Sequence, residues 1–262
     1  MDIQGKRVVV TGAASGIGKA LVLAFHKHGA SKVVSVDINK ADADTTAKEV
    51  NGLAIEANVG DEQDIQRVVT ESTEWMGGID IFCSNAGIMG EVGLLDTSTE
   101  KWQKIWEVNV MAHIFAAKAV LPQMLERGEG YLMNTASAAG LLTTLGAAPY
   151  TVTKSAAVSF AEWVKITYGE KGIGVSCLCP QAVRTAMTQN GPGVAGVDGM
   201  LEPDAVAEEV LNAIQTETFL VTPHAEVLEY VKRKANDRDR WITGMQRLQK
   251  QFEDFLTPKS EK

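Results

Sequence analysis

The stretch that decides the fold reads TGAASGIG and covers residues 11–18. A strand-like run, residues 6–10, precedes it, and an apolar stretch of helical character follows it. Glycine permits a sharp turn, a close approach of backbone N–H groups to a phosphate, and tight packing of a helix on a strand, and a helix N-terminus adds unpaired donors. Gly12, Gly16 and Gly18 therefore predict a turn that binds the pyrophosphate of a dinucleotide, with an ordinary strand-to-helix turn as the alternative.

Asp37 strengthens the nucleotide interpretation. It ends the next apolar run, close to the offset of about 20 residues at which an acidic residue meets the adenosine ribose in such folds. Its carboxylate can accept from both ribose hydroxyls and would repel a 2′-phosphate, so NAD is preferred over NADP. Ala13, Ala14 and Ile38 offer a phosphate no positive charge. The alternative is that Asp37 merely begins a helix, a task that Asn39 is also able to perform.

Short apolar runs alternate with longer helical patterns along most of the chain, which is typical of βαβ units around a parallel sheet. The predicted strands cover residues 6–10, 32–37, 53–57, 79–84, 130–135, 174–179 and 218–221. No linker or shift in composition divides the 262 residues. The sequence therefore predicts an α/β fold: one Rossmann-type domain, residues 1–262, with a three-layer, doubly wound parallel sheet.

Composition excludes several classes of function. The net charge of −8 disfavours nucleic-acid binding, which needs clustered Lys and Arg. Three cysteines and four histidines lack metal-ligand spacing, so we expect no metal. The chain opens with charged residues rather than an apolar signal, and no apolar run approaches the roughly 18 residues of a membrane helix. We expect a reduced, cytoplasmic protein that does not enter a membrane.

Tyr150, Lys154 and Ser137 are the candidate chemical groups. Tyr150 and Lys154 are four residues apart and share one helix face, and Ser137 follows the fifth predicted strand. A phenol with an ordinary pKa of about 10 is a poor base near neutrality, and an ammonium nearby, together with an oxidised nicotinamide, would lower that pKa. Ser137 would bond the substrate oxygen. The alternative is a surface Tyr–Lys pair, which the glycine turn and Ser137 make less favoured.

The spaced motifs resemble the short-chain dehydrogenase/reductase family, in its single-domain NAD-dependent branch, over about residues 1–222. The residues that carry the resemblance are Gly12, Gly16, Gly18, Asn85, Ala86, Gly87, Asn109, Ser137, Tyr150 and Lys154. The resemblance implies reversible hydride transfer between a nicotinamide cofactor and an alcohol or carbonyl compound. It implies that Tyr150 is the general acid/base, that Ser137 orients the substrate oxygen, and that Lys154 lowers the tyrosine pKa and holds the nicotinamide ribose.

The resemblance also implies the remaining site residues. Asn109 would support a water that links Lys154 to solvent, although its residue type alone indicates a satisfied buried amide. The implied cofactor site comprises Gly12, Ser15, Gly16, Ile17, Gly18, Asp37, Ile38, Asn58, Val59, Asn85, Ala86, Gly87, Tyr150, Lys154, Pro180, Val183 and Thr185. The expected substrate-binding residues are Ser137, Leu142, Tyr150, Gln181 and Met187.

Two positions depart from the family pattern. Gln181 stands where the family usually has glycine, so it is either strained by a positive φ or available as a hydrogen-bonding group of the substrate pocket. Asn58 stands where the family commonly has aspartate, and its carbonyl oxygen can still accept from the adenine amine.

The segments expected to border the pocket are mostly apolar, which favours an apolar, uncharged alcohol or ketone. A glycine-rich segment near residues 184–202 predicts a mobile lid, with a surface loop as the alternative. Apolar residues at helical spacing near residues 224–256, among them Phe255, predict a C-terminal helical extension. Such a stripe serves either the core or a subunit contact, and the family commonly forms homodimers or homotetramers, so we expect self-association.

Two other functions stay open. A nucleotide-sugar epimerase or dehydratase also pairs Tyr with Lys, but resembles a longer two-domain design with different glycine spacing. An inactive module that senses NAD would leave the joint presence of Ser137, Tyr150 and Lys154 unexplained.

Overall fold

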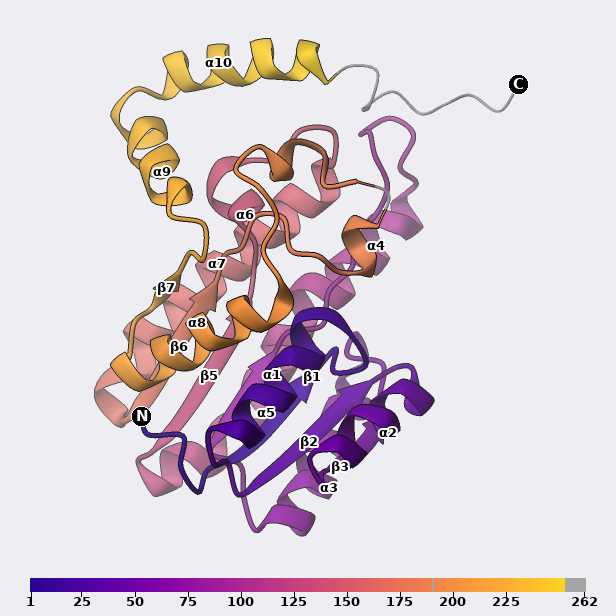
Figure 1. The fold of residues 1–262 in the computed structure, drawn as a ribbon, viewed down its shortest axis with the longest axis vertical. Coiled ribbons are helices and arrows are strands. Elements are labelled where there is room, and N and C mark those ends of the chain that lie inside the picture. Colours follow the sequence, from indigo (N-terminus) through magenta and orange to yellow (C-terminus); the bar gives the residue numbers. More distant parts are fainter. Residues whose placement is uncertain (190, 253–262) are drawn as a thin grey trace.

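The sheet at the centre of the molecule is parallel throughout. In the computed structural model, which describes residues 1–189 and 191–252, seven strands lie in the order β3-β2-β1-β4-β5-β6-β7 (Figure 1). The strands are β1 (Arg7–Thr11), β2 (Lys32–Asp37), β3 (Leu53–Glu56), β4 (Ile81–Ser84), β5 (Gly130–Thr135), β6 (Ile173–Leu178) and β7 (Leu220–Val221). Each predicted strand is present, and the fold class predicted from the sequence is confirmed.

Helices cover both faces of this sheet and make a three-layer molecule. The α-helices are α1 (Gly16–Lys27), α2 (Lys40–Glu49), α3 (Glu62–Met76), α4 (Thr99–Trp106), α5 (Ala112–Arg127), α6 (Ala138–Leu142), α7 (Ala148–Tyr168), α8 (Pro203–Thr216), α9 (Glu226–Asn236) and α10 (Arg238–Gln251). The apolar faces of α3, α5 and α7 share one hydrophobic core with the sheet, and those of α1 and α8 share another. Because both faces are covered, the strands read as continuous apolar runs.

The strand order places the candidate site. It reverses at β1, which pairs with β2 on one side and with β4 on the other. Ligands of open α/β sheets bind in the crevice at such a switch point, beyond the carboxyl ends of the strands. The glycine turn after β1 and the Asn85 segment after β4 meet there.

One helix meets the length and composition of a membrane span, contrary to the sequence-based expectation. It runs over Thr99–Arg127 through α4 and α5, with a mean hydropathy of 1.3 in its most apolar window. More than half of that window, 56%, is buried in the protein, where α5 packs on α3 and the sheet. Its apolar composition is accounted for by the core that it helps to form.

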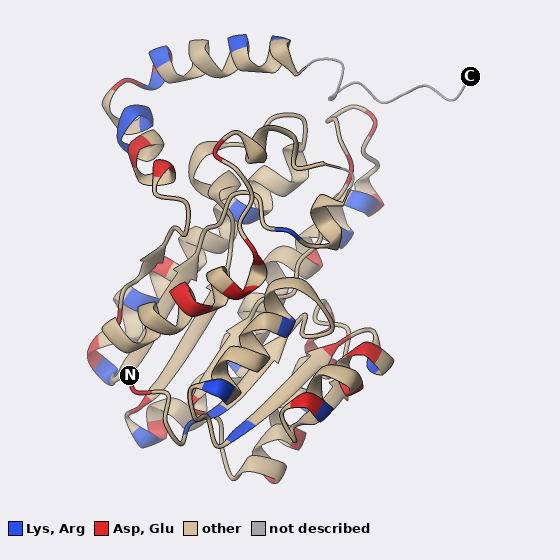
Figure 2. Cartoon of the chain, in the orientation of Figure 1, with Lys and Arg blue, Asp and Glu red and all other residues tan. Residues whose placement is uncertain are grey.

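The C-terminal extension consists of α9 and α10. Val227 anchors α9 against Ala138 and Leu142 of α6, whereas α10 has no fully buried residue and lies across the end of the molecule (Figure 1). The expected range reached residue 256, and residues 253–256, with Phe255, lie outside the described residues. Acidic and basic residues both occur along the chain, in the N-terminal as in the C-terminal half (Figure 2).

Candidate active site

Backbone conformation and close packing account for the three glycines of the first turn. Gly12 and Gly16 have φ values of +68° and +53°, which glycine adopts at little cost. At Gly18 a Cβ would lie 1.9 Å from the carbonyl oxygen of Gly12. Ser15, the N-cap of α1, makes no side-chain capping bond, so the first turn of α1 keeps N–H donors for an anion.

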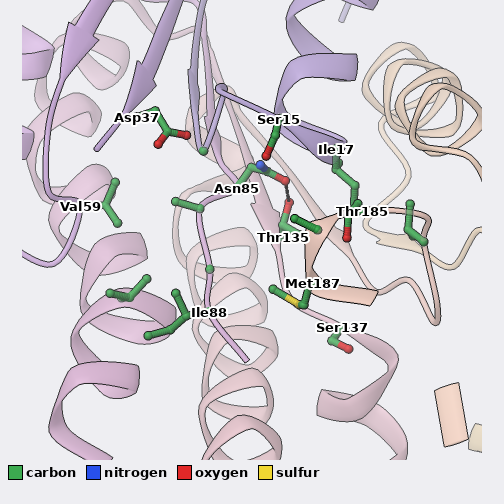
Figure 3. A pocket seen from close by; sticks show the side chains of 18 of the residues that line it. Ser15, Ile17, Asp37, Val59, Asn85, Ile88, Thr135, Ser137, Thr185 and Met187 are labelled. Carbon is green, nitrogen blue, oxygen red and sulfur yellow. Dashed lines mark hydrogen bonds between the residues drawn. The ribbon is translucent and has the colours of Figure 1, made fainter. Parts of the chain in front are cut away.

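Asp37 is held at the edge of this turn by two backbone donors. Its Oδ2 accepts from the Ala14 N–H at 3.0 Å and its Oδ1 accepts from the Asn39 N–H at 3.0 Å. Asn39 caps α2 by accepting from the Asp42 N–H. The task of beginning the helix therefore falls to Asn39, and the Asp37 carboxylate faces the cavity (Figure 3).

Asn85 joins the ends of three strands. Its side-chain amide donates to the Thr11 carbonyl oxygen at 3.0 Å, and its Oδ1 accepts from the Thr135 hydroxyl at 2.9 Å (Figure 3). The sequence analysis missed Thr135 as a site residue. Its carbonyl oxygen also accepts from Lys154 Nζ at 3.0 Å. The only signal for it was its position at the end of a predicted strand.

Tyr150 and Lys154 lie side by side on α7 as predicted. Lys154 Nζ is 5.7 Å from the centroid of the Tyr150 ring, and burial lowers the pKa of Lys154 to about 8. Burial also raises the pKa of the Tyr150 phenol, while the Ser137 hydroxyl beside it acts to lower that pKa. In the protein alone, the neighbours of Tyr150 do not offset the cost of removing the phenolate from water. The expected lowering of this pKa includes the charge of an oxidised nicotinamide, and it stays a prediction.

Asn109 is fully buried in a π-helical turn, Glu107–Met111, between α4 and α5. Its Oδ1 accepts from the Ile88 N–H at 2.9 Å, and its amide donates to the Ile88 carbonyl oxygen and to the Thr153 hydroxyl. A Cβ on Gly87 would lie 3.2 Å from Lys154 Nζ and 3.3 Å from Asn109 Oδ1. The asparagine is thus a satisfied buried amide that also lies close to Lys154, and its support of a water stays a prediction.

Gln181 bonds to Asp198, in the glycine-rich segment of residues 184–202. Its φ is not positive, so the alternative of a strained backbone is wrong. Its Nε2 donates to Asp198 Oδ2 at 3.0 Å, Tyr230 donates to the other oxygen of Asp198 at 3.0 Å, and the Gln181 N–H donates to His224 Nδ1 at 3.3 Å. Gln181 Oε1 is buried and has no partner among the described residues.

The predicted cofactor residues surround one cavity of about 430 Å³. All seventeen of them line it, and so do Ser137, Gln181 and Met187. Asn58 contributes an oxygen that already accepts from the Gly60 N–H at 3.1 Å and has a second lone pair. Lys104 from α4 also lines the cavity, and the sequence did not single it out. The bare glycine cradle and the carboxylate of Asp37 fit a dinucleotide.

A second cavity of about 960 Å³ meets the first at Ser137, Tyr150 and Gln181. The expected substrate-binding residues, Leu142 and Met187 included, all line this cavity. Asn109 lines neither cavity. Within residues 1–189 and 191–252, no group of three or more metal-ligating side chains comes together.

Comparisons with known proteins agree with this geometry. The sequence model of a family described as short chain dehydrogenase matches residues 6–192. The 1-deoxy-11-beta-hydroxypentalenate dehydrogenase of Streptomyces exfoliatus is 34% identical over 252 residues, which cover 93% of this chain and 92% of that protein.

Solved structures also resemble the chain over most of its length. A short chain dehydrogenase/reductase from Burkholderia phymatum in complex with NAD has a TM-score of 0.84 and 25% identity, and covers 91% of this chain and 96% of its own. The 3-ketoacyl-(acyl-carrier-protein) reductase of Brucella melitensis complexed with NADH has a TM-score of 0.79 and 28% identity, over 84% and 97% of the two chains.

Proposed function

The chain belongs to the short-chain dehydrogenase/reductase family of oxidoreductases, and we propose that it transfers a hydride between NAD(H) and an apolar, uncharged secondary alcohol or ketone. One observation supports this most strongly. Ser137 and Tyr150 lie where a glycine-cradled cavity meets a second, larger cavity, and Lys154 lines the first of them. A substrate in the larger cavity would present its oxygen to Ser137 and Tyr150.

In the direction of oxidation, Ser137 Oγ donates to the substrate oxygen and orients it. The Tyr150 phenolate takes the hydroxyl proton as the carbinol C–H bond breaks, and it returns a proton to the oxygen in the reverse direction. Bound nicotinamide supplies the acceptor for the hydrogen and its electron pair. The Lys154 ammonium stabilises the phenolate electrostatically, and its own contact with the Thr135 carbonyl oxygen fixes its position. We assign to Asn109 the support of a water that connects Lys154 to solvent.

NAD is proposed over NADP because of Asp37. Its carboxylate already accepts two backbone N–H bonds, and a carboxylate offers about four lone-pair sites, so capacity remains for two ribose hydroxyls. A phosphate on the ribose would meet this negative charge. The solved relatives named above were obtained with NAD and NADH.

Removing the negative charge of Asp37 and adding a positive charge at position 38 should shift the cofactor preference from NAD toward NADP. The double variant Asp37→Ala, Ile38→Arg should weaken NAD about tenfold to a hundredfold, because it loses charge-assisted hydrogen bonds of about 1.5–3 kcal/mol. The same variant should gain NADP binding. Ile38 is 68% exposed, so an arginine fits there. Dissociation constants for both cofactors test this, with Ile38→Arg alone as the control. Equal use of NAD and NADP by the unaltered protein would contradict the assignment.

Residues 184–202 are proposed as a lid over the larger cavity. The Val183–Leu201 bridge closes the ends of the segment, while its two short 3₁₀ turns, Ala186–Thr188 and Gly193–Gly196, bury no residue. Few buried contacts mean a low free energy of local opening. The segment also lines the cavity beside Tyr150, at Pro192 and Val197 among others.

Limited trypsin digestion tests the lid. Arg184, the sole Lys or Arg of this segment, has an exposed side chain. With NAD and an alcohol each at about ten times its dissociation constant, cleavage after Arg184 should slow about tenfold, because ligands bind the closed form. Cleavage after Lys171, in an exposed turn away from both cavities, is the control. Equal rates after Arg184 with and without ligands would rule the lid out.

Self-association and a cytoplasmic location belong to the same proposal. A homodimer or homotetramer is supported by the family, and light scattering on the purified protein measures it. The buried thiols of Cys83, Cys177 and Cys179 form no disulfide, which is consistent with a reducing compartment.

Turnover distinguishes this function from its rivals. Purified protein, NAD and a panel of apolar secondary alcohols should produce NADH absorbance. An NAD-sensing module would bind NAD without producing NADH from any alcohol. A nucleotide-sugar epimerase or dehydratase would convert a nucleotide sugar with no net NADH.

A further inference from the structure

The helix α10 lines the larger cavity, which Tyr150 also lines. We propose that α10 is part of the substrate site, and that the substrate is a bulky apolar secondary alcohol whose body fills the space between the catalytic tyrosine and α10. This inference rests on the proposed function and adds a substrate class to it.

One face of α10 lines the cavity. Trp241, Gly244, Met245 and Leu248 recur at intervals of one helical turn, and all four border the same space as Ser137 and Tyr150. Apolar residues of α6 and of the lid line the same cavity, Leu142 and Val194 among them. A ligand that reaches from Tyr150 to α10 is thus enclosed mostly by hydrocarbon.

Packing on the protein core does not explain why this face of α10 is apolar. No residue of α10 is fully buried, and within residues 1–189 and 191–252 the helix packs chiefly on its neighbour α9. Trp241 alone joins a hydrophobic cluster, with Tyr230 and Leu142. Met245 and Leu248 line the cavity, so a ligand there would cover apolar surface that the described residues leave open.

The position of α10 is linked to the catalytic residues. The rings of Tyr230 and Trp241 lie 6.3 Å apart between centroids. The Tyr230 hydroxyl donates to Asp198, which also accepts from Gln181 beside Tyr150. Lys234 Nζ donates to the Leu141 carbonyl oxygen at 2.6 Å. These contacts connect α9, and through it α10, to the cavity floor.

Gly244 keeps the cavity open at this wall. Glycine weakens a helix interior because it lacks a side chain and gains backbone freedom on unfolding. A Cβ on Gly244 would meet no atom within 4 Å, so packing within the chain does not require glycine there. The missing side chain leaves room on the cavity side.

The size and polarity of the cavity define the ligand class. About 960 Å³ lies near the upper end of the range for small-molecule sites, about 300–1,000 Å³. The charged residues at its rim, Arg233, Asp237 and Arg240, carry both signs and stand at the bend between α9 and α10. A polycyclic or long-chain secondary alcohol fits such a space, and a short alcohol leaves most of it unfilled.

A leucine scan of α10 tests the inference. Gly244→Leu places a side chain into the cavity, and Thr243→Leu, on an exposed neighbouring position outside it, is the matched control. The panel runs from sec-butanol through decalinol to a long-chain methyl carbinol and a steroid secondary alcohol, with NADH formation, thermal unfolding and molar mass as readouts. Gly244→Ala adds a smaller side chain at the same position and replaces Gly244→Leu in the test if the leucine variant does not fold.

The expected result has three parts. The unaltered enzyme shows a higher kcat/KM for the best bulky alcohol than for sec-butanol. Gly244→Leu lowers the ratio of kcat/KM for that bulky alcohol to kcat/KM for sec-butanol about tenfold or more. Thr243→Leu changes neither.

Other results would overturn the inference. One is a preference of the unaltered enzyme for sec-butanol, and another is a Gly244→Leu variant that affects large and small alcohols equally or affects neither. A third is a change of molar mass in Gly244→Leu, which would assign this face to a contact with a second copy of the chain. Failure of the proposed function is a separate outcome, since no alcohol, large or small, would then yield NADH.

Discussion

Replacing Tyr150 by phenylalanine is expected to lower kcat for alcohol oxidation about 100-fold to 10,000-fold, which is the contribution of a positioned general base. The phenyl ring keeps the shape of the site, but no oxygen remains to take the hydroxyl proton. NAD binding should stay nearly unchanged, since the glycine cradle and Asp37 are untouched. Initial rates of NADH formation and an NAD titration measure the two effects.

Tyr168→Phe is the matched control for this variant. Tyr168 ends the same helix, α7, and packs edge-on against Trp163 at 6.0 Å, away from both cavities. It should retain full turnover. Normal turnover in Tyr150→Phe would show that a group other than Tyr150 takes the substrate proton. The roles assigned to Ser137 and Lys154 beside Tyr150 would then be wrong as well.

The second large effect is expected from Gly18→Ala. The new Cβ would overlap the Gly12 carbonyl oxygen, 1.9 Å away, and crowd the Asn85 amide at 2.8 Å. A backbone atom cannot rotate out of the way, so α1 must move off β1, at a cost of about 1–3 kcal/mol in the free energy of unfolding. The same movement displaces the N–H donors of the turn, and NAD should bind about tenfold to a hundredfold more weakly.

Gly169→Ala provides the comparison. Gly169 has an ordinary helical φ of −58°, and the nearest atom to its Cβ position belongs to the Lys165 side chain at 3.7 Å. Urea unfolding and NAD titration of both variants show whether the loss of stability and of NAD affinity is caused by the clash at Gly18 or by the replacement of any glycine. Unaltered NAD affinity in Gly18→Ala would mean that the cofactor does not rest on this turn.

The pKa of Tyr150 shows where sequence reasoning reached its limit. The spacing of Tyr150 and Lys154 predicted a cation beside the phenol, and the two side chains do lie together. The spacing could not give the depth of burial, which raises the pKa of the phenol and lowers that of Lys154. The sign of the net shift depends on desolvation, and desolvation depends on every element packed around the site.

Gln181 illustrates the same limit. Its departure from the glycine of the family was visible in the sequence, with two alternatives of equal standing. The φ of Gln181, which is not positive, excludes the strained backbone. Its side chain bonds to Asp198, 17 residues along the chain, and Asp198 bonds to Tyr230, a further 32 residues along. Hydrogen bonds over such separations have no local signal in the sequence.

Local patterns in the sequence were sufficient to predict the parallel sheet, the glycine turn, Asp37 at the end of β2, and the Tyr150–Lys154 pair. These features depend on interactions between near neighbours in the chain, such as backbone φ, the periodicity of apolar residues and the four-residue step of a helix. The folded structure was needed to see that Thr135 bonds to Lys154, that Asn109 lies in a π-helical turn, and that α10 and Tyr150 line the same cavity. Those contacts form because a folded core brings distant segments to one edge of the sheet, where burial and geometry, rather than residue order, determine which groups meet.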